Sequence, residues 1–425
     1  MLRGTQPLAP SESSGARLRR VNERAGGSGS VRVVLRDTHH PREASRFALQ
    51  WHLTHACEMH CRHCYDRSKL SPLGYADAVR VLDDLVAFCA RHGVIGSVIL
   101  SGGNPFLHPS FFEIYRAAIE RRLGVGILGN PVPRADLERL VAIAKPRYYQ
   151  VSLEGLESHN DSIRGPGSYR AVIDFLPVLK ELGIESYVMV TLTRGNVEEI
   201  VPLGRLLAGR VDHLCWNRLS QVGEGAALGA PSRDQFVTFL RDYILARVTA
   251  PHLMFKDNLV NIPRHQLGLP LYGGCTGYGC GAAFNFVALL PNGDVHACRK
   301  FPSKIGNVLE DGLEAAYQSD AASAYRRGST ACDGCAIRSR CGGCLATAHG
   351  SGLDALRERD PYCFWDERDE WFPEARVAEI PKDTRRAILA EHRARSVAVS
   401  GTDGSTSCVG IAEETGSAVV SPEKV

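Results

Sequence analysis

Three cysteines, Cys57, Cys61 and Cys64, stand within eight residues, just after an apolar stretch that reads as a β-strand. Three thiolates at this spacing can ligate three irons of a [4Fe–4S] cube, which leaves the fourth iron open to another ligand. Zinc is the alternative, because a closed zinc site needs a fourth protein ligand. The histidines of this loop that could supply it are His55, His60 and His63. The spacing alone leaves both metals open.

Eight further cysteines are concentrated between residues 275 and 363. They are Cys275, Cys280, Cys298, Cys332, Cys335, Cys341, Cys344 and Cys363. Eight is two sets of four, and four thiolates fully ligate one [4Fe–4S] cluster. A zinc ribbon fits poorly, because only five residues separate the two Cys-x2-Cys pairs of this segment. Of the remaining three cysteines, we expect Cys89 and Cys215 to be small core residues and Cys408 to have no role.

The cysteine loop must be held by the elements around it, and residues 46–250 alternate apolar strands with amphipathic helices. We expect strands at Phe47–Thr54, Gly96–Leu100, Gly124–Leu128, Tyr148–Leu153, Glu185–Leu192 and Asp212–Leu219. The helices expected between and after them include Ala76–Arg91, Asn196–Ala208 with Asn196 as N-cap, and Arg233–Arg247. This alternation predicts a parallel sheet with right-handed crossovers, either an open doubly wound sheet or part of a barrel.

The composition of the chain changes near residue 265, after which Gly and Cys become frequent. We expect a second, smaller domain over residues 265–370, with a hairpin at 284–298 turning at Asn292-Gly293. The other segments are expected to be a flexible arm at 1–45, a helical segment at 371–395 and a disordered tail at 396–425.

Composition sets the broad class of the protein. The 425 residues are 44% apolar and 23% charged, which excludes wholesale disorder, collagen-like repeats and a membrane bundle. A net charge of +3 gives no reason to expect a nucleic-acid or membrane partner. The sequence has no signal-peptide pattern and no apolar run long enough to cross a bilayer. We expect a cytoplasmic protein, whose clustered cysteines serve as metal ligands and not in disulfides.

The CxxxCxxC spacing followed by Tyr65 resembles the radical S-adenosylmethionine enzymes. The resemblance implies a catalytic [4Fe–4S] cluster on Cys57, Cys61 and Cys64, whose open iron chelates S-adenosylmethionine. An electron from the cluster then yields a 5′-deoxyadenosyl radical that abstracts hydrogen from a substrate. The resemblance also implies the fold, a partial (β/α)6 TIM-type barrel followed by a small cysteine-rich SPASM domain. It places the site at the carboxyl ends of the strands.

The same resemblance supplies candidate cofactor contacts. The segment LSGGNP at 100–105 is similar to the family's glycine-rich motif for the methionine amine, with Asn104 where Glu is usual. We attribute its glycines to a close approach of the backbone to the ligand. The segment VSLEG at 151–155, with the later Asn160 and Arg164, is similar to the family's SLDG…HD…RG pattern, with Glu154 and Asn160 replacing two aspartates. The implied cofactor-binding residues are Tyr65, Gly102, Gly103, Asn104, Pro105, Ser152, Arg164, Thr191, Asn196 and Arg218.

The eight later cysteines resemble the SPASM extension of peptide-modifying radical enzymes. The resemblance implies one auxiliary [4Fe–4S] cluster on Cys275, Cys280, Cys298 and Cys344. It implies a second on Cys332, Cys335, Cys341 and Cys363. We favour electron transfer as the role of these clusters, with ligation of a substrate thiol as the alternative.

The SPASM branch acts mostly on peptides, so the expected activity is oxidation or crosslinking of a residue in a ribosomally made precursor. Sulfatase maturases carry Asp directly after the cysteine that matches Cys298, and Arg299 stands there, which argues against formylglycine formation. Segments 126–131, 217–226 and 274–282 look most like the selenobiotic, or thio(seleno)oxazole-type, maturases, whose precursors are Cys-rich. Expected partners are the precursor peptide, a separate leader-binding protein and a reductant such as flavodoxin or ferredoxin. The leader-binding protein is expected because we expect no leader-recognition domain in residues 1–45. The alternatives are a radical enzyme acting on RNA or a small molecule, and a non-catalytic iron–sulfur carrier or zinc scaffold.

Overall fold

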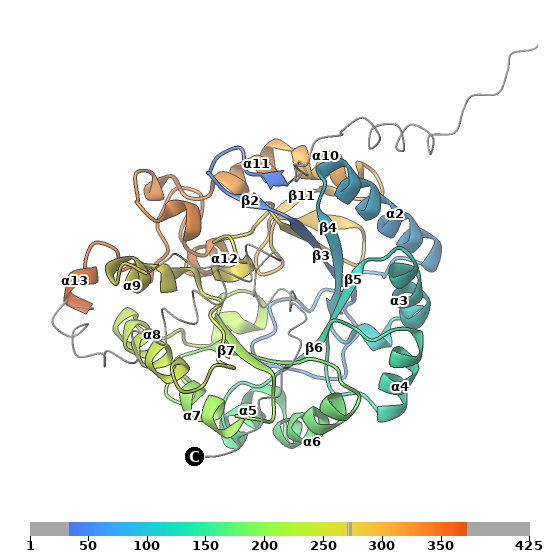
Figure 1. The fold of residues 1–425 in the computed structure, drawn as a ribbon, viewed down its shortest axis with the longest axis horizontal. Coiled ribbons are helices and arrows are strands. Elements are labelled where there is room, and N and C mark those ends of the chain that lie inside the picture. The colour runs from blue at the N-terminus through green and yellow to red at the C-terminus, as the bar shows by residue number, and fades with distance from the viewer. Residues whose placement is uncertain (1–33, 270, 272–273, 372–425) are drawn as a thin grey trace, which may run out of the picture. The chain divides into compact units, whose positions relative to one another are not determined.

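Six parallel strands form the centre of the molecule in the computed structural model, which describes residues 34–371 except 270 and 272–273. They are β3 (Arg46–Thr54), β4 (Ile95–Gly102), β5 (Gly124–Leu128), β6 (Tyr148–Ser152), β7 (Ser186–Leu192) and β8 (His213–Arg218). Each pairs in parallel with the next along the chain, in the order β3-β4-β5-β6-β7-β8. The predicted strands are confirmed to within about two residues, and the sheet curves as a partial barrel (Figure 1).

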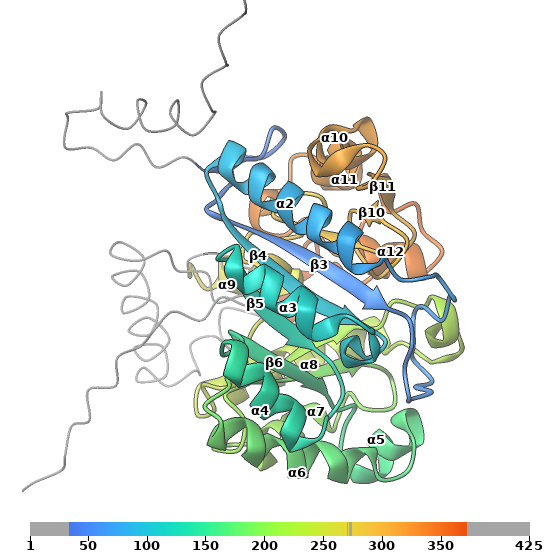
Figure 2. The same ribbon diagram turned by 90° about the vertical axis from the view of Figure 1, so that its right-hand side faces the viewer.

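Helices cover the outer face of this sheet, as Figures 1 and 2 show for the side formed by β3 to β6. They are α2 (Tyr75–His92), α3 (Phe111–Glu120), α4 (Arg134–Ile143), α5 (Glu157–Arg164), α6 (Ser168–Glu181), α7 (Ile200–Leu206) and α8 (Arg233–Arg247). In α2 the buried residues Ala78, Val81, Leu82, Leu85 and Phe88 recur at helical spacing and pack on the sheet. Because helices cover one side and side chains fill the other, the residues of β3 and β7 are buried almost throughout.

The expected N-cap at Asn196 is wrong. Helix α7 begins at Ile200, and Asn196 lies in the turn that precedes it. Its side chain is fully buried and bonds to backbone groups at the ends of two strands, so it holds this turn against the barrel and does not start a helix.

The expected hairpin is confirmed, and it joins the barrel sheet. Strands β9 (Phe286–Leu289) and β10 (Asp294–His296) are antiparallel around the Asn292-Gly293 turn, where Gly293 has a φ of 89° that favours glycine. Strand β9 pairs in parallel with β3, and β11 (Lys304–Asn307) adds to β10. The two predicted domains therefore share one nine-stranded sheet in the described part of the chain.

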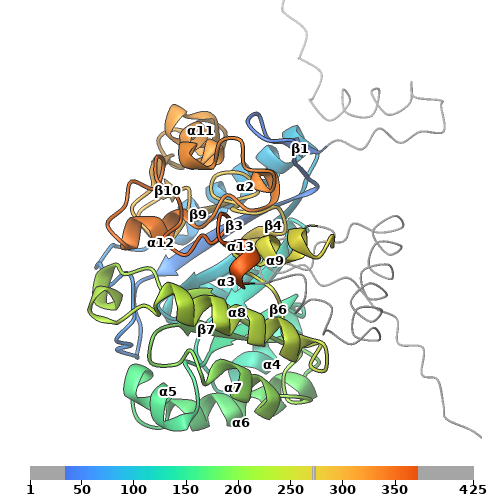
Figure 3. The same ribbon diagram turned by 90° about the vertical axis from the view of Figure 1, so that its left-hand side faces the viewer.

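The remaining described α-helices lie beyond this sheet and are short. They are α9 (Asn261–Gln266), α10 (Gly312–Gln318), α11 (Asp320–Arg327), α12 (Leu345–Gly350) and α13 (Arg368–Trp371). Helix α10 contacts both β11 and α2, and α13 lies beside α9 (Figure 3). Apart from these helices, the cysteine-rich segment is mostly loop, so its order depends on contacts between cysteine-bearing loops.

A flexible arm is the wrong description for residues 34–45. Strands β1 (Leu35–Arg36) and β2 (Glu43–Ala44) pair there, and Arg42 between them is buried. Its guanidinium donates to the carbonyls of Tyr278 (2.9 Å) and Cys280 (2.7 Å). The rest of the expected arm, residues 1–33, and the expected segment and tail from 372 onward lie outside the described residues. None of the described helices is long and apolar enough to cross a bilayer.

Candidate functional site

A cavity of about 780 Å³ opens at the carboxyl ends of the parallel strands, and we call it the main cavity. Cys57, Cys61 and Cys64 line one side of it, and residues from the ends of β4 to β8 line the others. Its volume falls within the range of about 300–1,000 Å³ that is usual for small-molecule and cofactor sites. The strand ends and the cysteine loop thus meet around one space, as expected for a barrel of this type.

The cysteine loop is fastened to the barrel by a carboxylate that the sequence did not single out. Glu58, directly after Cys57, accepts hydrogen bonds from the amides of Asn104 and Asn130, both at 2.9 Å. Asn130 also lies 3.6 Å from the sulfur of Cys57. These contacts join the loop to the ends of β4 and β5, so they fix where the first cysteine stands.

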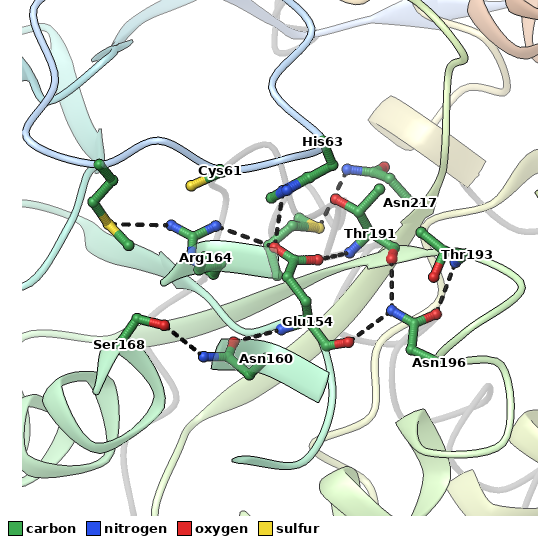
Figure 4. A network of polar contacts seen from close by, with 12 residues as sticks. Cys61, His63, Glu154, Asn160, Arg164, Ser168, Thr191, Thr193, Asn196 and Asn217 are labelled. Carbon is green, nitrogen blue, oxygen red and sulfur yellow. Dashed lines mark hydrogen bonds and ion pairs between the residues drawn. The ribbon is translucent and has the colours of Figure 1, made fainter. Parts of the chain in front are cut away.

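Glu154 is the second fastening point, and Figure 4 shows the network around it. Its carboxylate lies 3.0 Å from Nε2 of His63, which is in the cysteine loop, and accepts from Arg164 Nη1 at 3.1 Å. It also accepts from the backbone N–H of Thr191 at 2.9 Å. Burial alone would raise the pKa of this carboxyl, but these partners together hold its pKa below the ordinary value. Glu154 therefore stays charged and ties the loop, β7 and α5 to the end of β6.

Gly102 and Gly103 are required for a reason that was not inferred from the sequence, in addition to the predicted approach of a ligand. A Cβ on Gly102 would lie 2.1 Å from the carbonyl oxygen of Thr54, and one on Gly103 would lie 2.1 Å from that of Ala56. Both glycines let β4 approach the start of the cysteine loop, where the N–H of Gly103 donates to Thr54. In this structure the two glycines make room for the backbone of Thr54 and Ala56, and the approach of a ligand to them stays a prediction.

Seven of the ten predicted cofactor-binding residues line the main cavity. They are Tyr65, Gly102, Gly103, Ser152, Arg164, Thr191 and Arg218. Asn104 and Pro105 lie behind this wall, where Asn104 caps a 3₁₀ turn and holds Glu58. Asn196 does not reach the cavity either, because its amide bonds to the backbone of Glu154, Thr191 and Thr193. These three residues position the wall of the cavity and do not form its surface.

Arg218 lines the cavity, but its guanidinium is already occupied. Nε lies 2.6 Å from Asp257, and the two terminal nitrogens lie 2.6 and 2.7 Å from the carboxylate of Asp360. All three side chains are buried. Asp360 also accepts from the backbone N–H of Cys344 at 2.8 Å. The arginine at the end of β8 therefore binds the cysteine-rich segment.

A second cavity adjoins the main cavity and encloses one of the two predicted cysteine sets, Cys275, Cys280, Cys298 and Cys344. Burial raises the pKa of Cys280 to about 12 and that of Cys298 to about 11, and the neighbouring thiols of the set add to this. Arg299 and Lys300 line both cavities, so they form part of the wall between them.

A third cavity encloses the other predicted set, Cys332, Cys335, Cys341 and Cys363. Burial raises the pKa of Cys332 to about 11. The eleven cysteines of the three predicted clusters are free thiols. Thiols gathered in fours around two cavities, with no disulfide between them, fit a cationic metal centre that would neutralise their thiolates. The residues present therefore fit the [4Fe–4S] groups.

Sequence reasoning missed Glu58, Asn130, Arg42 and Asp360. Each acts through a partner far along the chain, so no local motif marks it. Only Glu58 had a signal in the sequence, because it is a charged residue directly after the first cysteine of a motif. His52, His55 and Asp66 each offer one atom that could bind a metal ion, and these three atoms lie within 4.8 Å of one another beside the cysteine loop. Of the three histidines that could complete a zinc site, His55 contacts Asp66, His63 contacts Glu154 and His60 contacts Arg67.

Comparison with known proteins agrees with this arrangement. Residues 51–207 match the radical SAM superfamily, and residues 280–344 match SPASM, an iron–sulfur cluster-binding domain. The chain therefore belongs to the radical SAM superfamily and carries a SPASM domain. It is an enzyme whose cofactors are S-adenosylmethionine and iron–sulfur clusters.

Its relatives include two bacterial biosynthetic proteins. Mycofactocin maturase MftC of Mycobacterium tuberculosis is 30% identical over 336 residues, which cover 74% of this chain and 82% of the relative. The antilisterial bacteriocin subtilosin biosynthesis protein AlbA of Bacillus subtilis is 25% identical, over 75% of this chain and 70% of the relative. The crystal structure of Streptococcus suis SuiB bound to precursor peptide SuiA has the same fold, with a TM-score of 0.59 and 19% identity, over 75% of this chain and 76% of SuiB.

Proposed function

We propose that this protein is a peptide maturase that oxidises or crosslinks a residue of a ribosomally made, Cys-rich precursor. The observation that carries the proposal is the wall shared by the main cavity and the second cavity. A substrate residue in the main cavity would lie beside the cysteines of the first auxiliary set, which is the arrangement that a coupled two-electron oxidation needs.

The chain's own residues would hold the reacting groups in place. Cys57, Cys61 and Cys64 would ligate the catalytic cluster, and Arg164 and Ser152 would orient the cofactor. When bound, the clusters and S-adenosylmethionine together supply an adenosyl radical and sites that accept the electron left on the substrate. Glu58 and Glu154 keep the cysteine loop against the strand ends, so the cofactor and the substrate share one enclosed space.

A peptide substrate is supported by the relatives, since a maturase and a bacteriocin biosynthesis protein are among them and a neighbour in fold binds a precursor peptide. Formylglycine formation is disfavoured, because Arg299 stands where that reaction places an acid. The partners we propose are the precursor, a separate leader-binding protein and a reductant such as flavodoxin or ferredoxin. A reducing cytoplasm suits a protein with this many free thiols.

The proposal is tested with the purified enzyme, reconstituted anaerobically, and any short Cys-rich peptide that is encoded beside its gene. Intact protein should hold about twelve iron atoms, four for each cluster. It should form 5′-deoxyadenosine and change the mass of the peptide by the loss of hydrogen. Deoxyadenosine without any change in the peptide, but with a change in an RNA or a small metabolite, would contradict the peptide assignment.

Two cysteine variants separate the roles of the clusters. Cys57→Ala should abolish 5′-deoxyadenosine, whereas Cys335→Ala should spare uncoupled cofactor cleavage and block the peptide product. Cys89→Ala is the matched control, because that thiol is buried in α2 and lines none of the three cavities. Normal product from Cys335→Ala would refute the role of the second auxiliary set in electron transfer.

A further inference from the structure

The main cavity is lined by far more positive than negative side chains. Its basic lining residues are Arg67, Lys69, Arg164, Arg218, Arg299 and Lys300. Asp66 is the acidic residue of the lining within the described part of the chain, and its carboxylate is paired with His55. A partly enclosed space with this excess of positive charge favours an anionic occupant.

Three of these six cations already have carboxylate partners, and a fourth, Lys69, is exposed to solvent. Arg164 pairs with Glu154, Arg218 with Asp257 and Asp360, and Arg67 lies 3.6 Å from Glu224 near the rim. Their charges are neutralised by the protein itself, so they do not account for the excess.

Arg299 and Lys300 have only neutral partners at hydrogen-bond distance among the described residues. Arg299 donates to the hydroxyl of Tyr65 at 3.3 Å and lies over its ring, 5.6 Å from the centroid. Lys300 donates to the carbonyl of Arg218 at 3.4 Å. Both are partly buried, and a cation removed from water without an opposite charge is costly. Lys300 also lines the second cavity beside Cys275, Cys298 and Cys344, whose thiolates would offset its charge. Arg299 is therefore the cation that an anion in the main cavity would complete.

The position of this pair favours the substrate as its ligand, with the cofactor as the alternative because Arg299 contacts Tyr65, a predicted cofactor-binding residue. The pair lies in the wall toward the first auxiliary cysteines, directly after Cys298, whereas Arg164 lies on α5 and is paired through Glu154 with the cysteine loop. A guanidinium presents a planar fork that matches a carboxylate and keeps its charge at every physiological pH. Tyr65 holds that fork at the cavity edge.

We propose that Arg299, with Lys300 beside it, is a carboxylate-binding subsite that orients the substrate peptide in the main cavity. The inference rests on the proposed peptide-maturase function and names the chemistry of the substrate. The carboxylate is either an Asp or Glu side chain near the residue that loses hydrogen, or the free end of the peptide. An arginine here in place of an acid thus changes the subsite from one that accepts a proton to one that binds an anion.

The test measures binding to an array of short peptides by the reconstituted enzyme saturated with S-adenosylmethionine. The array carries Asp, Glu, Asn and Gln peptides, each as the free acid and as the amide. We expect acidic peptides to be retained about tenfold more strongly than their amide counterparts, equivalent to about 1.4 kcal/mol. Retention of amidated Asp or Glu peptides assigns the side chain as the source. Retention of every free-acid peptide, whatever its side chains, assigns the carboxylate at the end of the peptide as the source.

Arg299→Gln should remove this preference, and Arg299→Lys should keep part of it. Arg116→Gln, which removes one charge from the exposed face of α3, is the control and should bind as the unaltered enzyme does. The iron content of each variant and its uncoupled 5′-deoxyadenosine are measured in parallel, so loss of the fold or of the radical chemistry is distinguished from loss of carboxylate binding.

Two results would overturn the proposal. An equal preference for acidic peptides in Arg299→Gln would place the anion elsewhere. A tenfold weaker affinity for S-adenosylmethionine in Arg299→Gln, measured by equilibrium dialysis, would assign the subsite to the carboxylate of the cofactor. Neither result bears on the peptide-maturase proposal, which is decided by the mass of the precursor.

Discussion

At the scale of single residues, Glu154 determines how the site is assembled. It is a buried carboxylate with a histidine, an arginine and a backbone amide as partners, and these come from three different segments. Removing one member of such a group leaves the others buried with unbalanced charge, which costs more than the pair itself contributes. The residue therefore acts through His63 and Arg164, as a positioning residue.

We predict that Glu154→Gln destabilises the protein by about 3–5 kcal/mol at about pH 7, because Arg164 loses its buried counter-charge. The control is Glu157→Gln, whose partner Arg170 is 3.8 Å away at the surface and for which at most about 1 kcal/mol is expected. Denaturant unfolding of the metal-free variants measures both. An equal loss in the two variants would contradict the role given to Glu154.

The same carboxylate predicts a pH dependence. Its pKa in the folded protein lies below the ordinary 4.5, so it stabilises the fold above that value and the contribution is lost as pH falls through the folded pKa. The stability difference between the unaltered protein and Glu154→Gln should therefore shrink in acid. A stability difference that stays constant as the pH falls below 4.5 would indicate that the pKa of this carboxyl is the same in the folded and unfolded states.

At the scale of elements, the site depends on how closely the end of β4 approaches the cysteine loop. The sequence motif located this place correctly but not the atoms that demand glycine. The backbone of Thr54 and Ala56 occupies the space that a side chain would need. The distance between strand end and loop is thus set by two residues without a Cβ.

We predict that Gly103→Ala displaces the cysteine loop and weakens S-adenosylmethionine binding by about tenfold or more, since overpacking of this kind costs about 1–3 kcal/mol. Its Cβ would lie 2.1 Å from the oxygen of Ala56 and 2.9 Å from Cβ of Cys57. Gly74→Ala, where a Cβ meets nothing within 4 Å, is the control. Cofactor affinity and 5′-deoxyadenosine formation are the measurements, and unchanged values for Gly103→Ala would refute the argument.

At the scale of the whole molecule, the barrel and the cysteine-rich segment are connected by buried charge. Arg218 ends β8, while Asp360 holds the backbone of Cys344 and lies three residues before Cys363. One arginine from the barrel thus contacts the part of the chain that carries both auxiliary cysteine sets.

We predict that Arg218→Lys lowers the iron content of the auxiliary sites and shifts their electron paramagnetic resonance spectrum, because an ammonium cannot satisfy Asp257 and both oxygens of Asp360 together. Uncoupled cleavage of S-adenosylmethionine should be less affected than formation of the peptide product. Arg233→Lys, which pairs with Glu367 near the surface, should leave both unchanged. An unaltered spectrum in Arg218→Lys would show that the pair has no influence on those cysteines.

Whether a feature of the structure could be predicted from the sequence depends on how far apart along the chain the interacting residues lie. Strand β5 and helix α8 have the predicted bounds, because apolar periodicity and the flanking residues are local signals. The grouping of the cysteines around their cavities followed from spacing and family resemblance. The roles of Asn196 and Arg218 did not, because their partners are fixed only once distant strands come together.

The pairing of β9 with β3 limits where this chain can be divided. Strand β3 carries the cysteine loop, and without β9 it would become an open sheet edge whose residues are buried on both faces. Unprotected edges of this kind recruit strands from other molecules and lead to aggregation. A shortened enzyme ending after α8, or a hybrid that exchanges the cysteine-rich segment, would need to bring a compatible replacement for β9. Such a hybrid should be designed around that strand and not around the cysteines.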